Sequence, residues 1–241
     1  MKQHTLLRPV AAAIIGLMLL VDSSCNAPQR REKELVLFYD VPLVCGAAPD
    51  IGCGSRAKPV FIDLERQPNI KEAWLNRSGT VIAVVGGPSV TDRQQIVDIA
   101  EPIFKNHDLE VRFIGETKCL DSLMSDFHGD GPPAGRAGKW YRGVDVDQLS
   151  IEEAGRLAEK AVKFAREGNL ISEGESKAIK ADVEAYMKTE LVKVRTLTEL
   201  EEADERWHAD VYGIYQKHIG TKRAGEIRKF FEANQSGDHE E

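Results

Sequence analysis

In the first half of the chain, segments with the apolar pattern of a strand alternate with segments that have the apolar pattern of a helix. Residues 35–39 and 80–85 are continuous apolar runs, which indicate buried strands. Residues 109–114 place apolar side chains at every second position, which indicates a third strand. An amphipathic pattern predicts helices over residues 55–76 and 89–104. The order is therefore strand, helix, strand, helix, strand.

This order predicts an α/β domain over residues 34–146. We expect a three- or four-stranded, mainly parallel sheet with helices, in which residues 139–144 supply the short fourth strand. Glycines and prolines cluster between residues 119 and 146, which predicts an exposed loop there. Right-handed crossovers between parallel strands would bring the carboxyl ends of the first three strands to one edge of the sheet.

The second half of the chain reads as a helical region over residues 147–234. A Ser or Thr followed three residues later by Glu is typical of a helix start, and this capping box begins at Ser150, Ser172 and Thr198. The pattern leaves open whether these helices dock on the sheet or form a separate bundle. Residues 235–241 are polar and are predicted to form a disordered tail.

The amino terminus has the pattern of an export signal. A basic start precedes an uncharged stretch of roughly a dozen residues, shorter than the ~20 that a membrane-spanning helix needs. Residues 1–24 are therefore predicted to be a signal peptide. Ser23, Ser24 and Cys25 resemble the lipobox of bacterial lipoproteins, although Asp22 stands where that family usually has Leu.

The lipobox resemblance implies that Cys25 carries the lipids, with residues 25–33 as a polar tether. A soluble secreted protein and an uncleaved anchor are the alternatives. The expected location is the cell envelope, on the periplasmic side of a bacterial membrane. There, the chain is expected to contact the membrane through the lipid anchor. Another envelope protein is a second expected partner.

Composition and charge narrow the function classes. The hydrophobic content of 42% is sufficient for a core, and the formal net charge of −7 provides no basic surface for nucleic acid. An exported chain enters an oxidising compartment, where cysteines pair unless something prevents it. If Cys25 is lipidated, Cys45, Cys53 and Cys119 remain.

These three cysteines are the candidate site. Cys45 and Cys53 lie in the glycine-rich loop after the first strand, and seven residues separate them. Cys53 precedes a predicted helix start, which would favour its thiolate. Cys119 follows the third strand and would therefore reach the same edge of the sheet. The three thiols would be catalytic residues of thiol redox chemistry, or, with His128, ligands of a soft metal ion.

A structural disulfide between Cys45 and Cys53, with an inert Cys119, is the alternative to both. A strand that runs into a cysteine loop and then a helix is similar to thioredoxin-like proteins, but the likeness covers about thirty residues and lacks the Cys-x-x-Cys motif. Two hypotheses result. The first is a thiol-dependent envelope protein, either a thiol–disulfide oxidoreductase or a soft-metal binder. The second is a non-catalytic scaffold that binds a partner through its helices, motivated by the aromatic side chains of residues 207–218.

Overall fold

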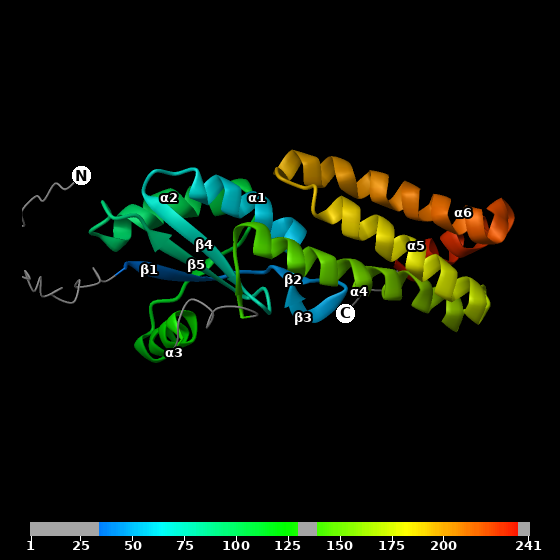
Figure 1. Ribbon diagram of the computed structural model, residues 1–241, viewed down its shortest axis with the longest axis horizontal. Helices are drawn as coiled ribbons and strands as arrows, with labels where there is room; N and C mark the ends of the chain where they lie inside the picture. Colours follow the sequence, from blue (N-terminus) through cyan, green and yellow to red (C-terminus); the bar gives the residue numbers. More distant parts are fainter. Residues whose placement is uncertain (1–33, 130–138, 236–241) are drawn as a thin grey trace, which may run out of the picture. The chain divides into compact units, whose positions relative to one another are not determined.

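The computed structural model describes residues 34–129 and 139–235, without the side chains of residues 144 and 232–235. The predicted signal peptide, Cys25, the tether and residues 236–241 lie outside the described residues. From Glu34 onward the chain groups into one compact unit. Within it, a sheet carries helices on both faces, and a set of long helices follows in sequence (Figure 1).

The main sheet has five strands in the order β6-β1-β5-β4-β7, and every neighbouring pair is antiparallel. The prediction of a mainly parallel sheet is therefore wrong. Its strands are β1 (Val36–Asp40), β4 (Ile70–Asn76), β5 (Val81–Gly86), β6 (Arg112–Phe113) and β7 (Trp140–Tyr141).

The error arises from β4, which occupies the end of the segment predicted to be helical. The helix α1 (Gly54–Glu65) ends earlier, and β4 then turns directly into β5. Because β5 inserts between β1 and β4 and pairs antiparallel with both, the crossover through α1 joins two strands that are not neighbours. The carboxyl ends of β1 and β5 consequently lie at opposite edges.

The two faces of the sheet have separate apolar cores. One core contains α1 and α2 (Arg93–Asn106) against side chains such as Tyr39 and Val84. The other contains α3 (Thr117–His128) against Val36, Phe38 and Trp140. In Figure 1, α1 and α2 lie on one side of the strands and α3 on the other. The helix α3 replaces the first part of the loop that was predicted between residues 119 and 146.

A small hairpin follows β1 and positions the cysteines. It consists of β2 (Val44–Cys45) and β3 (Ala48–Gly52), which pair antiparallel with a register shift at Cys45. The hairpin leads into α1, whose amino-terminal cap residue is Cys53. The backbone N–H of Cys53 donates to the carbonyl of Leu43 at 2.7 Å, so the start of α1 is tied to the base of the hairpin.

The long helices share one core and are joined to the sheet through the first of them. This helix, α4 (Val146–Glu167), follows a 3-10 turn, η2 (Gly143–Asp145). Its first turns pack Val146 and Leu149 into the core beneath α1, whereas Ala154 onward packs against α5 (Glu173–Leu191) and α6 (Leu197–Gln235). The helical region thus docks on the sheet domain by continuity of α4.

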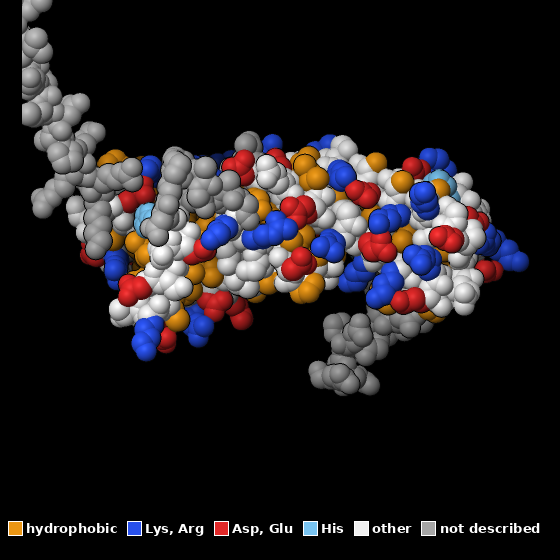
Figure 2. All heavy atoms as spheres, turned by 60° about the horizontal axis from the view of Figure 1, so that its bottom comes forward, with side chains coloured by type: hydrophobic (Ala, Val, Ile, Leu, Met, Phe, Trp, Pro, Cys, Tyr) orange, Lys and Arg blue, Asp and Glu red, His pale blue; other side chains and the backbone are white. Residues whose placement is uncertain are grey.

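The surface is charged, and basic and acidic side chains are interspersed over the face that Figure 2 shows. Among the described helices, none combines the length and the apolar character needed to cross a bilayer. A non-helical Gly220, with φ 79° and ψ 157°, divides α6 into two helical parts.

The capping predictions have three different outcomes. Ser172 and Glu175 form the expected capping box at the start of α5. The box of α6 lies two residues earlier than predicted, since Thr196 and Glu199 exchange the hydrogen bonds. Ser150 caps nothing, because α4 begins four residues before it and Ser150 is completely buried.

Candidate functional site: a buried thiol–carboxylate cluster

Two cysteines and a glutamate meet between the hairpin and α4. The Cys53 thiol donates to Glu153 Oε1 at 3.1 Å, and the Cys45 thiol approaches the same oxygen at 3.7 Å. The other carboxylate oxygen, Oε2, accepts from Ser55 Oγ at 3.5 Å. The exposed fractions of Cys45, Cys53 and Glu153 are 3%, 7% and 5%. The sequence prediction brought Cys45 and Cys53 together correctly and missed Glu153.

The start of α1 explains how a carboxylate is accommodated there. A helix amino terminus presents backbone N–H groups without helical partners and attracts negative charge. The backbone N–H of Ser55 in the first turn of α1 hydrogen-bonds to Glu153. Glu153 on α4 therefore occupies the anion-binding end of α1. Burial still raises the pKa of the Glu153 carboxyl, although the hydrogen bonds from Cys53, Cys45 and Ser55 oppose that rise.

This arrangement reverses the predicted reactivity of Cys53. The sequence favoured a thiolate at the helix start, with a lowered pKa. In the structure, burial raises the pKa of the Cys53 thiol, and the negative Glu153 beside it raises the pKa further. The same two causes raise the pKa of Cys45, opposed by backbone hydrogen bonds at Ala47 and Ala48. Both thiols are therefore held in the protonated form at neutral pH, and Glu153 takes the place expected for a thiolate.

The interface between α1 and α4 is a buried polar seam, which we define by Ser55, Lys58, Asp147, Ser150 and Glu153. The ammonium of Lys58, with a side chain 4% exposed, pairs with Asp147 and donates to the carbonyl oxygen of Val192 at 2.8 Å. A Cβ added at Gly54 would lie 2.5 Å from Ser150 Oγ, so the two helices approach closely here. Six polar residues are buried in the part of the chain that the structure describes, and four of them belong to this seam.

Cys119 does not join the cluster. It lies near the start of α3 and is exposed as a free thiol. Because β6 runs antiparallel to β1, the chain after β6 travels back along β1, away from the hairpin that follows Asp40. The predicted common edge for the three cysteines therefore does not exist, and the correction follows directly from the strand directions.

His128 is the last residue of α3 and is exposed, on the same helix as Cys119. Within residues 34–129 and 139–235, no group of three or more His, Cys, Asp or Glu side chains is arranged to hold a metal ion. The four predicted soft-metal ligands are thus divided between the hairpin–α4 interface, with Cys45 and Cys53, and α3, with Cys119 and His128. Cys45 and Cys53 are free thiols in this structure.

The aromatic face of α6 is core. Trp207 is 9% exposed and Tyr215 is 3% exposed, and both pack among the helices. The Tyr215 hydroxyl donates to the carbonyl of Ala161 on α4 at 2.8 Å. Trp207 and Tyr215, two of the aromatic residues that motivated a partner-binding groove, are therefore used to hold α4, α5 and α6 together.

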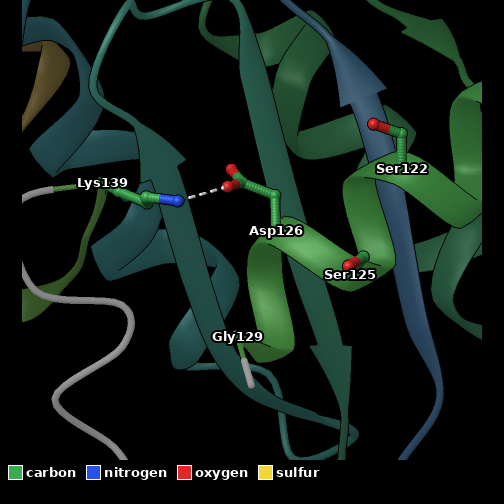
Figure 3. A pocket seen from close by; sticks show the side chains of 5 residues that line it. All are labelled: Ser122, Ser125, Asp126, Gly129 and Lys139. Atoms are coloured by element: carbon green, nitrogen blue, oxygen red, sulfur yellow. Dashed lines mark hydrogen bonds and ion pairs between the residues drawn. The ribbon is translucent and has the colours of Figure 1, made fainter. Parts of the chain in front are cut away.

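An open hollow beside α3 is a second candidate site (Figure 3). Lys139 reaches across it to Asp126, with 2.8 Å between Nζ and Oδ1, and both side chains are well exposed. Its remaining lining comes from Ser122, Ser125 and Gly129. A solvent-screened ion pair of this kind contributes little energy and brings no reactive groups together. The thiol–carboxylate cluster is therefore the stronger candidate site.

Comparisons with protein-family models, with curated proteins and with solved structures found no match for this chain. The interpretation of the site accordingly depends on its own geometry.

Proposed function

We propose that this protein is an exported cell-envelope protein, anchored through Cys25, whose Cys45–Cys53 pair responds to redox conditions by reversible thiol–disulfide exchange. The carrying observation is that both sulfurs lie against one buried carboxylate oxygen, at 3.1 and 3.7 Å. Because both sulfurs contact one oxygen, they share one small buried site and need only local movement to meet. The carboxylate accepts the proton of each thiol in turn.

The hairpin geometry supports a labile disulfide. Cys45 lies on β2, at the point where the register of the hairpin shifts, and Cys53 lies directly after β3. Both are free thiols in this structure, each against Glu153 Oε1, so forming an S–S bond of about 2.05 Å requires local movement. A disulfide that the surrounding structure strains is easily reduced again.

The electrostatics of the cluster support a protein that responds to redox conditions rather than a fast oxidoreductase. Thiolates are the attacking species in exchange, and both thiols have raised pKa values. Exchange at neutral pH is therefore slow. Oxidation also removes both thiol donors from Glu153, leaving it the hydrogen bonds from Ser55. The redox state of the pair thus changes the seam that joins α1 to α4.

Thiol mapping of the purified protein tests this proposal. The reduced protein is treated with a disulfide oxidant, alkylated in denaturant and mapped by mass spectrometry, beside Cys45→Ser, Cys53→Ser and Cys119→Ser variants. We expect one Cys45–Cys53 disulfide in the wild type and in Cys119→Ser, reopened by a mild reductant. A wild-type chain that forms no such disulfide, or one that mild reductant leaves intact, contradicts the proposal.

The proposed anchor has its own test. Wild-type protein expressed in bacteria should partition with the membrane fraction and enter the detergent phase. Cys25→Ser should move it to the aqueous phase without altering the Cys45–Cys53 chemistry. Equal partitioning of the two chains would contradict lipid attachment at Cys25.

A further inference from the structure

The cover over each sulfur decides which thiol an external disulfide meets first. Exposed fractions of 3% and 7% do not rank Cys45 and Cys53, because both are buried. Cys53 lies at the start of α1, where its N–H donates to Leu43 and its carbonyl accepts from Ala57 at 3.1 Å. Its backbone is fixed on both sides, and its side chain lies under Glu153 of α4.

The backbone around Cys45 is held less firmly. The next residue, Gly46, is exposed, and a Cβ added there would meet no atom within 4 Å. The β2 strand contributes only two residues to the ladder. The backbone N–H of Ala47 points at Cys45 Sγ, at 3.4 Å from nitrogen to sulfur, and such a donor stabilises a thiolate as it forms. A small opening of the tip therefore exposes Cys45 before Cys53.

A basic side chain stands at this tip. Lys160 of α4 is exposed and donates to the carbonyl oxygen of Gly46 at 3.4 Å. Among the described residues no carboxylate pairs with it, whereas the neighbouring Arg156 pairs with Asp50 at 3.5 Å. An uncompensated positive charge beside the opening attracts anions over about a Debye length, roughly 10 Å at 0.1 M salt.

We infer that the oxidant of this dithiol is a small anionic disulfide, which reacts first with Cys45 near Lys160, and that Cys53 then resolves the mixed disulfide. This inference rests on the proposed function and names its reactant and its order of events. The Cys45 thiol passes its proton to Glu153, and its thiolate attacks the external disulfide RS–SR. A Cys45–SR bond forms, the S–S bond of the reactant breaks, and one RS⁻ leaves.

The second exchange closes the ring. Glu153 first returns its proton to the departing RS⁻ and then accepts the proton of the Cys53 thiol. The Cys53 thiolate attacks the Cys45 sulfur, the Cys45–SR bond breaks and the second RS⁻ leaves with the proton that Glu153 gives up. The dithiol loses two electrons and two protons, the external disulfide is reduced to two RSH, and the carboxylate is unchanged overall.

Two probes of opposite charge test the inference. Glutathione disulfide is anionic and cystamine is cationic at neutral pH, and both carry out the same exchange. All variants carry Cys119→Ser, because the exposed Cys119 would otherwise react, and adducts are located by peptide mapping of acid-quenched samples. For the parent, we expect the ratio of the glutathione disulfide rate to the cystamine rate to be several-fold higher than the intrinsic reactivities of the two probes would give. High salt should reduce this difference.

Charge reversal at Lys160 has a control at an exposed lysine far from the hairpin. Lys160→Glu should shift the rate ratio several-fold toward cystamine. Lys105→Glu, at an exposed lysine in the last turn of α2, which Figure 1 shows well apart from β2 and β3, should leave the ratio within about twofold of the parent. A ratio that Lys160→Glu does not change overturns the assignment of an anionic reactant.

Single-cysteine variants test the order of attack. Cys53→Ser should accumulate a stable glutathione adduct on Cys45, whereas Cys45→Ser should form its Cys53 adduct at least tenfold more slowly. Equal or faster adduct formation on Cys53 overturns the proposed order. These failures leave the Cys45–Cys53 disulfide intact, and they are thus distinct from failure of the proposed function, in which no probe produces that disulfide.

Discussion

The buried ion pair of Lys58 and Asp147 makes a quantitative prediction about how the seam is held. Three variants form a double-mutant cycle: Lys58→Met, Asp147→Leu, and the two together. Each single change leaves one charge of the pair behind, whereas the double change replaces both charges with apolar groups of similar size. The cycle separates the cost of an orphaned charge from the net contribution of the pair.

The exposure of the two partners sets the expected sizes. Removing one member of a buried pair costs roughly 3–5 kcal/mol when the other charge is left in the interior. Asp147→Leu leaves the Lys58 ammonium 4% exposed with only the Val192 carbonyl, so we expect a loss of about 3 kcal/mol or more. Lys58→Met leaves Asp147 23% exposed and therefore partly hydrated, but also removes the donor to Val192, so we expect about 2 kcal/mol.

The double variant should be the informative one. Apolar replacement of a buried pair is often neutral or stabilising, so Lys58→Met/Asp147→Leu should lie within about 1 kcal/mol of the wild type. Urea unfolding at pH 7 with reductant present, followed by circular dichroism, gives the four free energies. Additive losses in the double variant would show that the pair is not the buried, mutually dependent contact described here. A Lys58→Met loss larger than that of Asp147→Leu would reverse the exposure argument.

Two further predictions concern the same seam and a third concerns α6, and the two glycine substitutions are measured by thermal melts. Since burial raises the pKa of Glu153 in the folded state, its contribution to stability is present below the unfolded pKa of about 4.5 and is lost as pH rises through the folded pKa. Glu153→Gln should lack this loss, which amounts to up to about 1.4 kcal/mol per pH unit. If the free energies of unfolding in urea change with pH in the same way for the two chains from pH 4 upward, the pKa shift is refuted. Gly54→Ala should destabilise the protein by at least about 2 kcal/mol, because its Cβ would meet Ser150 and the Val146 carbonyl at 2.5–2.7 Å. Gly213→Ala, on a helical site with nothing within 4 Å, should stabilise by roughly 0.5–1 kcal/mol in the same thermal melts, and a destabilised Gly213→Ala would contradict the open surroundings of that site.

The sequence predicted the positions of the main strands better than their directions. The apolar runs at residues 35–39 and 80–85 became β1 and β5 with shifts of one residue. The strand β4 was hidden because a bulge lies between Ile70 and Glu72. Its buried residues are Ile70, Ala73 and Leu75, a spacing of three and then two, which does not show the strict alternation expected of a strand. Because β4 was not detected, the direction of β5 relative to β1 was predicted wrongly.

The site was predicted in part, for an identifiable reason. Proximity of Cys45 and Cys53 is a local property of one loop and could be inferred from their spacing. Glu153 lies 100 residues from Cys53 and was interpreted as a capping residue of Ser150. The available signal was its position within the apolar stripe between Leu149 and Ala154, because a glutamate there must be buried with a partner.

The position of α4 determines which segment must move when Cys45 and Cys53 form a disulfide. Asp147, Ser150 and Glu153 lie at intervals of three on this helix and contact Lys58, Gly54 and the thiols in turn. The close approach of Gly54 to Ser150 leaves no room for α1 and α4 to slide, and the turns that follow are fixed in the helical core. The tip of the hairpin has fewer constraints, since β2 contributes two residues and the tip contacts α4 through exposed side chains. Its base is fixed, because the Gly52 N–H donates to the carbonyl of Arg77 at 2.6 Å and a Cβ added at Gly52 would lie 3.0 Å from the Cα of Gly79. Closing a Cys45–Cys53 bond therefore moves the Cys45 end of the hairpin toward α1, and Glu153 stays in place as the carboxylate against which the pair opens again.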